Sequence, residues 1–443
     1  MSDTKQILKK LFAFTIPLVL SGILQQLFSW VDAFIVGNVV GEHALSAIGI
    51  TSVVHTLFIT LLIGFTSGLS IQFAQLYGAN KISEMKKSME EYILVLLIVF
   101  TLFTFLGIFS MDFILKMMDT PISLFKGAKE YGIILFMGIP FLTLYNLYSS
   151  LLRAMGNSKV SFYAVLLSSI LNVGLDLLLV AVFPYGVKGA AIATVVSQIA
   201  MTLYLMYYTY TTYENLRVSL SLKCDVNTLK EGSKYGFPPA IQSGVISVGN
   251  VILQKFMNGF GEYTVAAIST AYRIDSLLLL PITNFGTGIA TLVAQNVGAN
   301  NINESKKIMK IGMVTMCFIS IGLTLLILLF GESLVAMFGL SKQSIEIGKT
   351  FFYTIAMFYI ICGLNSVIRG YLEGIGDLIF TGVMGIVSLG VRIVSSYAFV
   401  NIFGNMVIAY AEAFSWIFLL IVYVLRYIYK GHMSRICKNE MIK

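Results

Sequence analysis

Long apolar runs recur along the whole chain and are separated by short polar segments. Each run reaches about 20 residues or more, the length that an α-helix needs to cross about 30 Å of hydrocarbon. Strands of a transmembrane barrel would need only about 10 residues and would alternate strictly, so this pattern excludes a barrel. It predicts an all-α polytopic membrane protein with twelve transmembrane helices, at roughly 11–37, 44–76, 92–112, 130–152, 160–183, 189–212, 237–258, 264–296, 308–330, 347–369, 379–402 and 405–429.

The second half of the chain repeats the first. The segment Gln75 to Lys87 matches Gln295 to Lys307, and Gly41-Glu42 matches Gly261-Glu262, both at an offset of 220 residues. Matches that recur in order indicate two pseudo-symmetric lobes of six helices each, a kind of repeat known among transporters. We therefore expect an N-terminal lobe (1–212), a cytoplasmic inter-lobe connection (213–236), a C-terminal lobe (237–430) and a cytoplasmic tail (431–443).

Composition and charge support this interpretation. Only 12% of the residues are charged, whereas soluble domains contain about 25%. The net charge of +8 comes from basic residues in short loops, such as Lys81 and Lys306, that fall on one side of the predicted membrane. This bias predicts a multi-pass protein of the inner or plasma membrane with both termini in the cytoplasm. Because topology explains the basic residues, they do not suggest nucleic-acid binding.

Two acids stand inside apolar segments of the first half, Asp32 in the first and Asp176 in the fifth. A carboxylate at this depth costs at least about 2.5–3.5 kcal/mol on insertion scales, so it marks a functional site by default. The second half has no acid at either corresponding position. Residues three or four apart share a helix face, and this spacing gives three polar stripes: Gln25, Ser29 and Asp32, then Ser169, Asn172 and Asp176, then Thr194 and Gln198.

A pair of carboxylates among amide and hydroxyl oxygens suits a small hard cation or a proton. Two neighbouring carboxylates cannot both ionise cheaply, so one cluster could exchange a proton for a cation. The alternative is that each acid is a helix-packing residue with hydrogen-bonded neighbours. His55 is an accessory polar candidate whose simpler interpretation is a hydrogen-bonded interior residue. Arg273 and Asp275 are interpreted as structural or gating residues, and no role is assigned to three further charged positions, Lys255, Arg392 and Glu412.

The sequence contains no catalytic pattern. It has no Walker phosphate-binding loop and no His-Glu-x-x-His motif, and its only histidines are His43, His55 and His432. We therefore expect no enzyme and no cofactor. Transport by this chain would have to be driven by an ion gradient or by a partner.

Several motifs, taken in order, resemble those of the multidrug and toxic compound extrusion (MATE) transporters. They are Val31-Asp32 with Val36-Gly37, Gln75-x-x-Gly78-Ala79, Arg153 to Asn157, Asn172-x-x-x-Asp176, Gly189 to Thr194, Gln295-x-x-Gly298-Ala299 and Arg369-Gly370. The resemblance covers essentially the whole chain. It implies antibiotic-resistance transport, in which cationic or amphipathic drugs leave the cell by alternating access while Na⁺ or H⁺ enters.

The resemblance is to the DinF-like bacterial branch of that family. The ion site of that branch consists of Asp, Asn, Asp and Thr, which correspond here to Asp32, Asn172, Asp176 and Thr194. These four are the expected coupling site and the expected Na⁺ ligands. In the NorM-like branch, acids of the seventh and tenth helices matter. Here the seventh helix has no acid after Pro238, and Glu373 is the nearest match in the tenth, so we regard Glu373 as accessory.

Two other functions stay open. A flippase of related fold would carry lipid-linked wall precursors, but it would be expected to have several cavity arginines for phosphate groups, and the arginines within the predicted spans are few. A non-transporting scaffold or channel is the second alternative, and the repeat with its acid pair in one lobe argues against it. We expect a monomer that acts on small molecules within the lipid bilayer.

Overall fold

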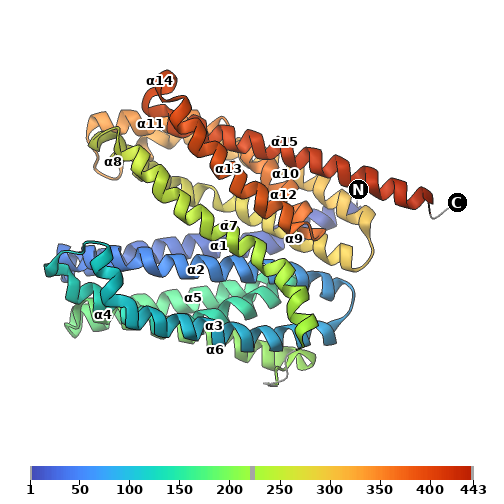
Figure 1. Cartoon of the computed structure of the whole chain (residues 1–443), viewed down its shortest axis with the longest axis horizontal. Coiled ribbons are helices and arrows are strands. Elements are labelled where there is room, and N and C mark those ends of the chain that lie inside the picture. The colour runs from blue at the N-terminus through green and yellow to red at the C-terminus, as the bar shows by residue number, and fades with distance from the viewer. Residues whose placement is uncertain (1, 220–224, 441–443) are drawn as a thin grey trace. The chain divides into compact units, whose positions relative to one another are not determined.

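The computed structural model describes residues 2–219 and 225–440, with side chains for 4–219 and 225–430. Residues 220–224 of the predicted connection and 441–443 of the predicted tail lie outside the described residues. Each predicted membrane segment lies on one helix or on consecutive helices (Figure 1). The first half contains α1 (Ser2–Val39), α2 (Glu42–Gly78), α3 (Ile82–Met117), α4 (Ile122–Ala154), α5 (Ser158–Asp176), the π-helical turn η1 (Leu177–Val182), α6 (Gly186–Thr212) and η2 (Glu214–Leu216). The second half contains α7 (Val226–Asn258), α8 (Glu262–Leu278), α9 (Leu280–Gly298), α10 (Ile302–Ala336), α11 (Lys342–Ala356), α12 (Tyr359–Gly374), α13 (Leu378–Ala398), α14 (Val400–Phe403), η3 (Gly404–Met406) and α15 (Val407–Glu440).

Most of these helices meet the requirements of a membrane span. Within the described chain, 10 spans are long and apolar enough, and α8 with α9 counts as one of them. The pair α11 and α12 forms an eleventh span that is bent by 49°. The remaining predicted segment lies on α7, which has 33 residues but carries Lys230, Glu231 and Lys234 in its first half and two prolines in its middle. Its polarity, not its length, sets α7 apart.

The internal repeat is visible in the backbone. Gly41 before α2 and Gly261 before α8 have positive φ angles of 105° and 86°, which glycine adopts at little steric cost. Three more pairs with positive φ recur at the same offset of 220 residues: Asn80 and Asn300, Asp119 and Gly339, and Gly156 and Gly376. The turns between helices are therefore repeated in conformation as well as in order.

Contacts divide the chain into two compact units. We call them the N-unit, residues 16–240, and the C-unit, residues 1–15 and 241–443. The boundaries fall inside α1 and α7, close to Pro17 and to Pro238 and Pro239. Proline removes a backbone hydrogen bond from the helix interior and favours a kink. Both helices thus change unit next to a proline.

The N-unit is built around α4, which packs against α2, α3 and α6. The first part of α7 lies against α2 in this unit, and the Tyr92 hydroxyl of α3 donates to the carbonyl of Leu229, 2.6 Å away. A Cβ on Gly68 would lie 1.9 Å from the carbonyl oxygen of Tyr235. In lipid, the hydrophobic effect does not drive helices together, so they associate largely through van der Waals packing. Small residues such as Gly68 allow the close backbone approach that this packing needs.

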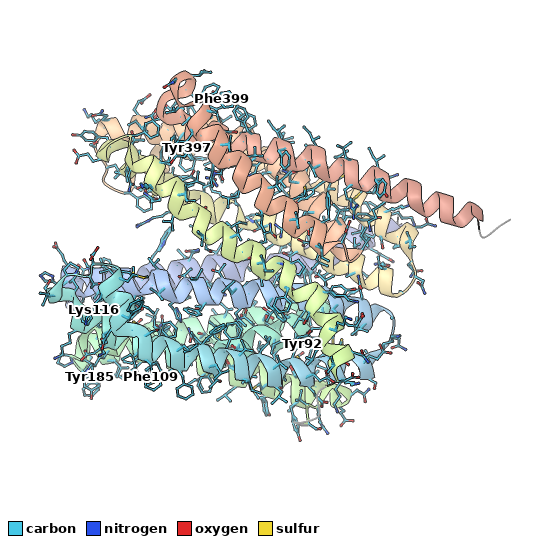
Figure 2. All side chains as sticks on the ribbon, viewed as in Figure 1. Tyr92, Phe109, Lys116, Tyr185, Tyr397 and Phe399 are labelled. Carbon is cyan, nitrogen blue, oxygen red and sulfur yellow. The ribbon has the colours of Figure 1, made fainter. Side chains whose placement is uncertain are left out.

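The C-unit is built around α12, which packs against α9, α10 and α15. Its buried core includes Phe285 and Tyr371, and Ile7 and Leu11 from the start of α1 join that core. Apolar side chains also cover the outer faces of helices in both units. Phe109 on α3, for example, is 83% exposed (Figure 2), as expected for a surface that contacts lipid.

We expect Gly68→Ala to destabilise the protein and Gly49→Ala to leave it unchanged or slightly more stable. Both glycines lie on α2, but a Cβ at Gly49 would meet nothing within 4 Å. Overpacking at Gly68 should cost about 1–3 kcal/mol, whereas the exposed helix position should gain up to about 1 kcal/mol. Thermal unfolding of both purified variants in detergent checks this. Equal melting temperatures would contradict the close contact of α2 with α7.

The described ends of the predicted connection are anchored on α3. The Lys87 ammonium lies 2.6 Å from a carboxylate oxygen of Asp225, and the Ser219 amide donates to Glu90 at 2.7 Å. The hydrogen bond from Lys87 lowers the pKa of the Asp225 carboxyl. Both groups are exposed, so this ion pair adds little stability.

Candidate functional site

The two membrane acids, Asp32 and Asp176, both lie near the C-terminal ends of their helices. Asp32 is half-buried on α1, about two turns before the helix ends at Val39. Asp176 is the last residue of α5, is 0% exposed, and is followed directly by η1. A π-helical turn within a helix is rare and is frequently found at functional sites. The carboxylate of Asp176 is thus held where the regular backbone pattern changes.

The glycine at position 189 allows this irregular turn to pack. A Cβ on Gly189 of α6 would lie 2.8 Å from the carbonyl oxygen of Leu179 in η1. The backbone of α6 can therefore approach η1 closely, and the two elements are in contact. Any larger residue at position 189 would push η1, and the adjoining Asp176, away from α6.

The carboxyl groups of Asp32 and Asp176 are close enough to hydrogen-bond to each other. Two carboxylates are both acceptors, so such a contact needs a proton on one of them or a cation between them. Without either, Oδ1 of Asp32 and both oxygens of Asp176 are buried and have no hydrogen-bond partner among the described residues. Buried carboxylate oxygens without partners are costly and require an explanation. A bound cation or proton supplies one.

The surroundings of this acid pair are apolar on one side. Tyr131 on α4 is buried and interacts electrostatically with both carboxylates. It belongs to a buried cluster with Val36 of α1, Val180 of η1 and Ala190 of α6. Residues of α2 join the same cluster, so five elements converge here. The low-polarity wall strengthens any charge interaction inside it. Sequence reasoning missed Tyr131, because an isolated tyrosine in an apolar segment carries no distinguishing pattern.

The other two expected ligands lie on the adjoining helices. Asn172 is half-buried on α5, one turn before Asp176. The Thr194 hydroxyl on α6 donates to the carbonyl of Ala190 at 3.0 Å, which leaves its oxygen able to accept from a donor or to contact a cation. Since α5 and α6 pack together, these residues share a helix pair with Asp176. Among the described residues, neither Asn172 nor Thr194 makes a hydrogen bond to Asp32 or Asp176.

The accessory candidates are dispersed. Gln198 has a buried Oε1 without a partner among the described residues, and Ser169 is buried, whereas Gln25 and Ser29 are exposed. The buried His55 ring lies edge-on to Phe136, with ring centroids 6.2 Å apart. Glu373 belongs to the C-unit, where its carboxylate lies 2.6 Å from Arg369. The structure therefore brings Asp32 and Asp176 together, but it does not join all eight polar-stripe residues into one cluster.

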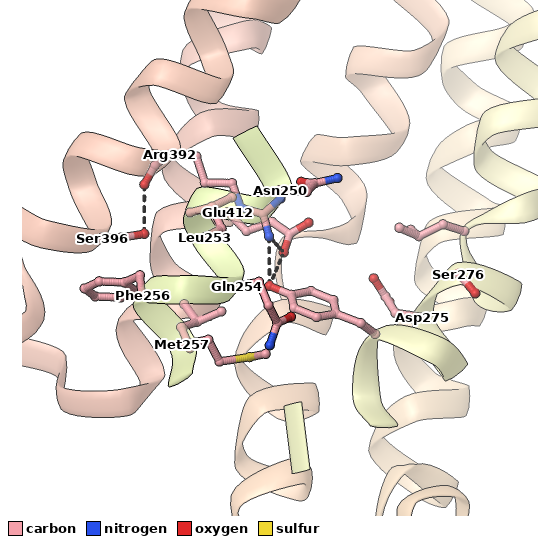
Figure 3. A pocket seen from close by; sticks show the side chains of 13 residues that line it. Asn250, Leu253, Gln254, Phe256, Met257, Asp275, Ser276, Arg392, Ser396 and Glu412 are labelled. Atoms are coloured by element: carbon pink, nitrogen blue, oxygen red, sulfur yellow. Dashed lines mark hydrogen bonds and ion pairs between the residues drawn. The ribbon is translucent and has the colours of Figure 1, made fainter. Parts of the chain in front are cut away.

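A second polar cluster lies in the C-unit, at residues to which the sequence assigned no ligand. Arg392 of α13 pairs with Glu412 of α15 at 2.8 Å and donates to the Tyr272 hydroxyl of α8 at 2.8 Å. The Tyr359 hydroxyl of α12 donates to Asp275 of α8. These groups line or adjoin a cavity of about 410 Å³ (Figure 3). Their partners are far apart in sequence, so no spacing rule could have joined them.

The sequence matches the MatE family model over residues 17–178 and 238–398. The chain belongs to the MatE family. One matched stretch lies in the first half of the chain and the other in the second half. The family consists of ion-coupled antiporters. The expectation of a membrane transporter, and not an enzyme, is therefore confirmed.

Curated relatives of this MatE chain agree over nearly its full length. It is 28% identical over 432 residues to YoeA of Bacillus subtilis, described as a "Probable multidrug resistance protein", with 94% of this chain and 93% of the relative covered. It is 24% identical over 378 residues to the "Multidrug export protein MepA" of Staphylococcus saprophyticus, covering 85% and 83%.

Solved structures establish the fold. A mutant of the Vibrio cholerae MATE transporter VcmN matches with a TM-score of 0.90 at 17% identity, covering 98% of this chain and 99% of that one. An outward-facing multidrug resistance MATE family transporter matches with a TM-score of 0.88 at 21% identity, covering 97% and 96%. The predicted all-α polytopic membrane fold is confirmed by these matches.

Proposed function

We propose that this MatE transporter belongs to the DinF-like branch and exports cationic or amphipathic drugs in exchange for Na⁺ or H⁺. The observation that carries the proposal is the pair of facing acids, Asp32 and Asp176, whose buried oxygens lack other partners among the described residues. Relatives named for multidrug resistance and multidrug export support the substrate class. Asn172 and Thr194 complete the proposed coupling site, with Asp32 and Asp176 as the charged ligands.

The physical basis of coupling is charge neutralisation. Two facing carboxylates in an apolar environment repel each other, and this repulsion is relieved when a proton or a Na⁺ ion joins them. An organic cation can relieve the same charge. Because the two cargoes then compete for one negative cluster, binding of one lowers the affinity for the other, and this linkage is reciprocal. Alternating access converts such competition into antiport, provided that the ion shifts the equilibrium between the two conformations.

Two arginines of the C-unit, Arg369 and Arg392, favour drug export over the flippase alternative. Arg369 and Arg392 are each paired with a glutamate, at 2.6 Å and 2.8 Å. A flippase would need such groups for the phosphates of its substrate. We further propose that the protein is a monomer of the inner or plasma membrane, that the two repeat halves act as its two lobes, and that both termini and the connection at 213–236 face the cytoplasm.

Transport from reconstituted vesicles tests this function. We expect a fluorescent organic cation to move uphill when a Na⁺ gradient or a pH gradient is imposed alone, with the membrane potential held at zero. The ion supplies the free energy through the shared acid cluster, so the flux should follow whichever gradient the cluster accepts. Flux that ignores both gradients would indicate a channel. Transport of a lipid-linked sugar instead of the organic cation would favour the flippase.

A further inference from the structure

We propose that a groove on the N-unit holds an anionic phospholipid, with an acyl chain against its apolar wall and the phosphate on Arg217. The groove shares no residue with the acid pair or with the cavity of the C-unit. Its residues come from α3, α4, α6 and the segment 216–218, so it lies entirely within the N-unit. The proposal rests on the proposed topology only for the leaflet that supplies the lipid, which is then the cytoplasmic one.

Three membrane helices and one short turn form the groove. Both α3 and α6 pack against α4, so α4 provides the floor between them, with Leu144 and Tyr148 among the lining residues. The turn η2 contacts both α3 and α6, and its Leu216 is buried. It therefore closes the groove at the end where α6 finishes at Thr212. Because α3, α4 and α6 all qualify as membrane spans, the rest of the groove is next to lipid.

The groove has the size and the wall that a lipid chain needs. Its volume is about 520 Å³, within the range of about 300–1,000 Å³ for ligand pockets. Aliphatic side chains line it, among them Ile93, Leu97 and Met206, and Leu203 at its edge is exposed. An empty groove would deprive these side chains of dispersion contacts. In a bilayer, an acyl chain that enters from the side supplies them.

Arg217 is the one charged residue among the described residues that line the groove. Its Nε donates to the carbonyl of Tyr210 at 3.0 Å, and its Cζ lies 4.9 Å from the centroid of the Tyr210 ring. These two contacts hold the guanidinium at the end of α6. Arginine has five donor hydrogens, and bonds to described residues leave three of them, on Nη1 and Nη2, for a ligand.

The glutamate beside Arg217 does not occupy it firmly. Nη2 of Arg217 lies 3.3 Å from Glu214, and the two side chains are 43% and 78% exposed. An exposed pair of this kind adds little stability. The glutamates that hold Arg369 and Arg392 are instead only 18% and 11% exposed. A phosphate diester can therefore accept two hydrogen bonds from the guanidinium of Arg217, the geometry that arginine favours with phosphate.

The charge of the groove selects an anionic headgroup. Two exposed tyrosines of α6, Tyr207 and Tyr210, line the groove close to Arg217, and tyrosines of membrane proteins concentrate at the depth of the headgroups. Arg217 brings one positive charge, and no acid is among the described lining residues. A headgroup with a net charge of −1 neutralises it, whereas a zwitterionic headgroup would place an ammonium group near the guanidinium.

Lipid retention by the purified protein in detergent tests the site. We expect native mass spectrometry during a lipid titration to show tighter binding of phosphatidylglycerol than of phosphatidylcholine with the same chains. Arg217→Gln should weaken phosphatidylglycerol binding at least fivefold and change phosphatidylcholine binding less than twofold. Lys81→Gln is the matched control, because Lys81 forms an exposed pair with Glu84, 2.9 Å away and also three residues apart, outside the groove. It should retain both lipids like the wild type.

A groove-filling variant tests the chain site separately from the phosphate. Met206→Trp should weaken binding of both lipids at least fivefold, whereas Leu106→Trp, at an exposed position of α3 outside the groove, should weaken neither. Equal affinity for the two lipids, or phosphatidylglycerol binding that survives Arg217→Gln or Met206→Trp, would overturn the proposal. Displacement of the lipid by glycerol 3-phosphate would also overturn it, because the site would then bind a soluble anion. No ion gradient is involved, so loss of lipid binding would not count against the proposed coupling site.

Discussion

Asp32→Asn and Asp176→Asn should each abolish uphill efflux of an organic cation, with a loss of more than tenfold in the gradient that the vesicles maintain. Asparagine has nearly the shape of aspartate but cannot exchange a charge for an ion. One neutral and one ionised group no longer need a cation between them, so ion binding stops driving the conformational change. The measurement is accumulation under an imposed Na⁺ or pH gradient, normalised to the amount of folded protein.

Folding of these variants should be unaffected or improved. Each substitution removes a buried carboxylate whose oxygens lack partners among the described residues, and such charges are costly. The new amide at position 176 can also donate to Asp32. Asp112→Asn is the matched control, because Asp112 is half-exposed and pairs with Lys129 at 2.7 Å on the same unit. If both membrane variants transport uphill like this control, the acids have only a packing role.

The neutral members of the proposed site should matter less. Asn172→Ala and Thr194→Ala each remove one oxygen without changing the charge of the cluster. We expect weaker dependence on the ion and not a complete loss of transport. A complete loss in Thr194→Ala with normal folding would show that its hydroxyl does more than donate to Ala190.

The sequence predicted the helices because lipid imposes a simple rule on them. Backbone groups in hydrocarbon must be satisfied within the helix, so each long apolar run had one available structure. The rule does not predict breaks within a span. Neither the 49° bend between α11 and α12 nor the π-helical turn after Asp176 has a distinct apolar pattern. The polar residues of α7 can be read from the sequence, but the sequence does not predict that this helix lies partly in each unit.

The candidate sites differ in predictability for a similar reason. Asp32 and Asp176 were found because an acid in an apolar run is conspicuous and because the repeat supplied an acid-free comparison. Arg392 and Glu412 were equally conspicuous, but they received no role. Their meaning depends on a contact with Tyr272 of α8, 120 and 140 residues away in the chain. Tertiary pairing of this kind is invisible to helical periodicity, which reports only on neighbours three or four residues apart.

The affinity of the transporter for Na⁺ should fall as the pH falls. Asp32 and Asp176 face each other, and one proton can remove the charge repulsion that otherwise favours Na⁺. The ligands of a metal ion must be deprotonated, so protons compete with the ion. In the range where the cluster takes up one proton, the apparent Na⁺ affinity should decrease about tenfold per pH unit. Equilibrium binding of radiolabelled Na⁺ to the purified protein at several pH values measures this.

Asp176→Asn should remove the pH dependence together with most of the Na⁺ binding, because it takes away the buried half of the acid pair. Glu332→Gln is the control and should reproduce the wild-type curve, because Glu332 pairs with Lys349 at 2.8 Å and is not part of the acid pair. Na⁺ and H⁺ would then be alternative ions for one cluster, and the prevailing gradient would decide which of them drives efflux. A Na⁺ affinity that is independent of pH, or that is unchanged in Asp176→Asn, would contradict a shared site. It would direct the search to the C-unit, where Glu373 is held by Arg369.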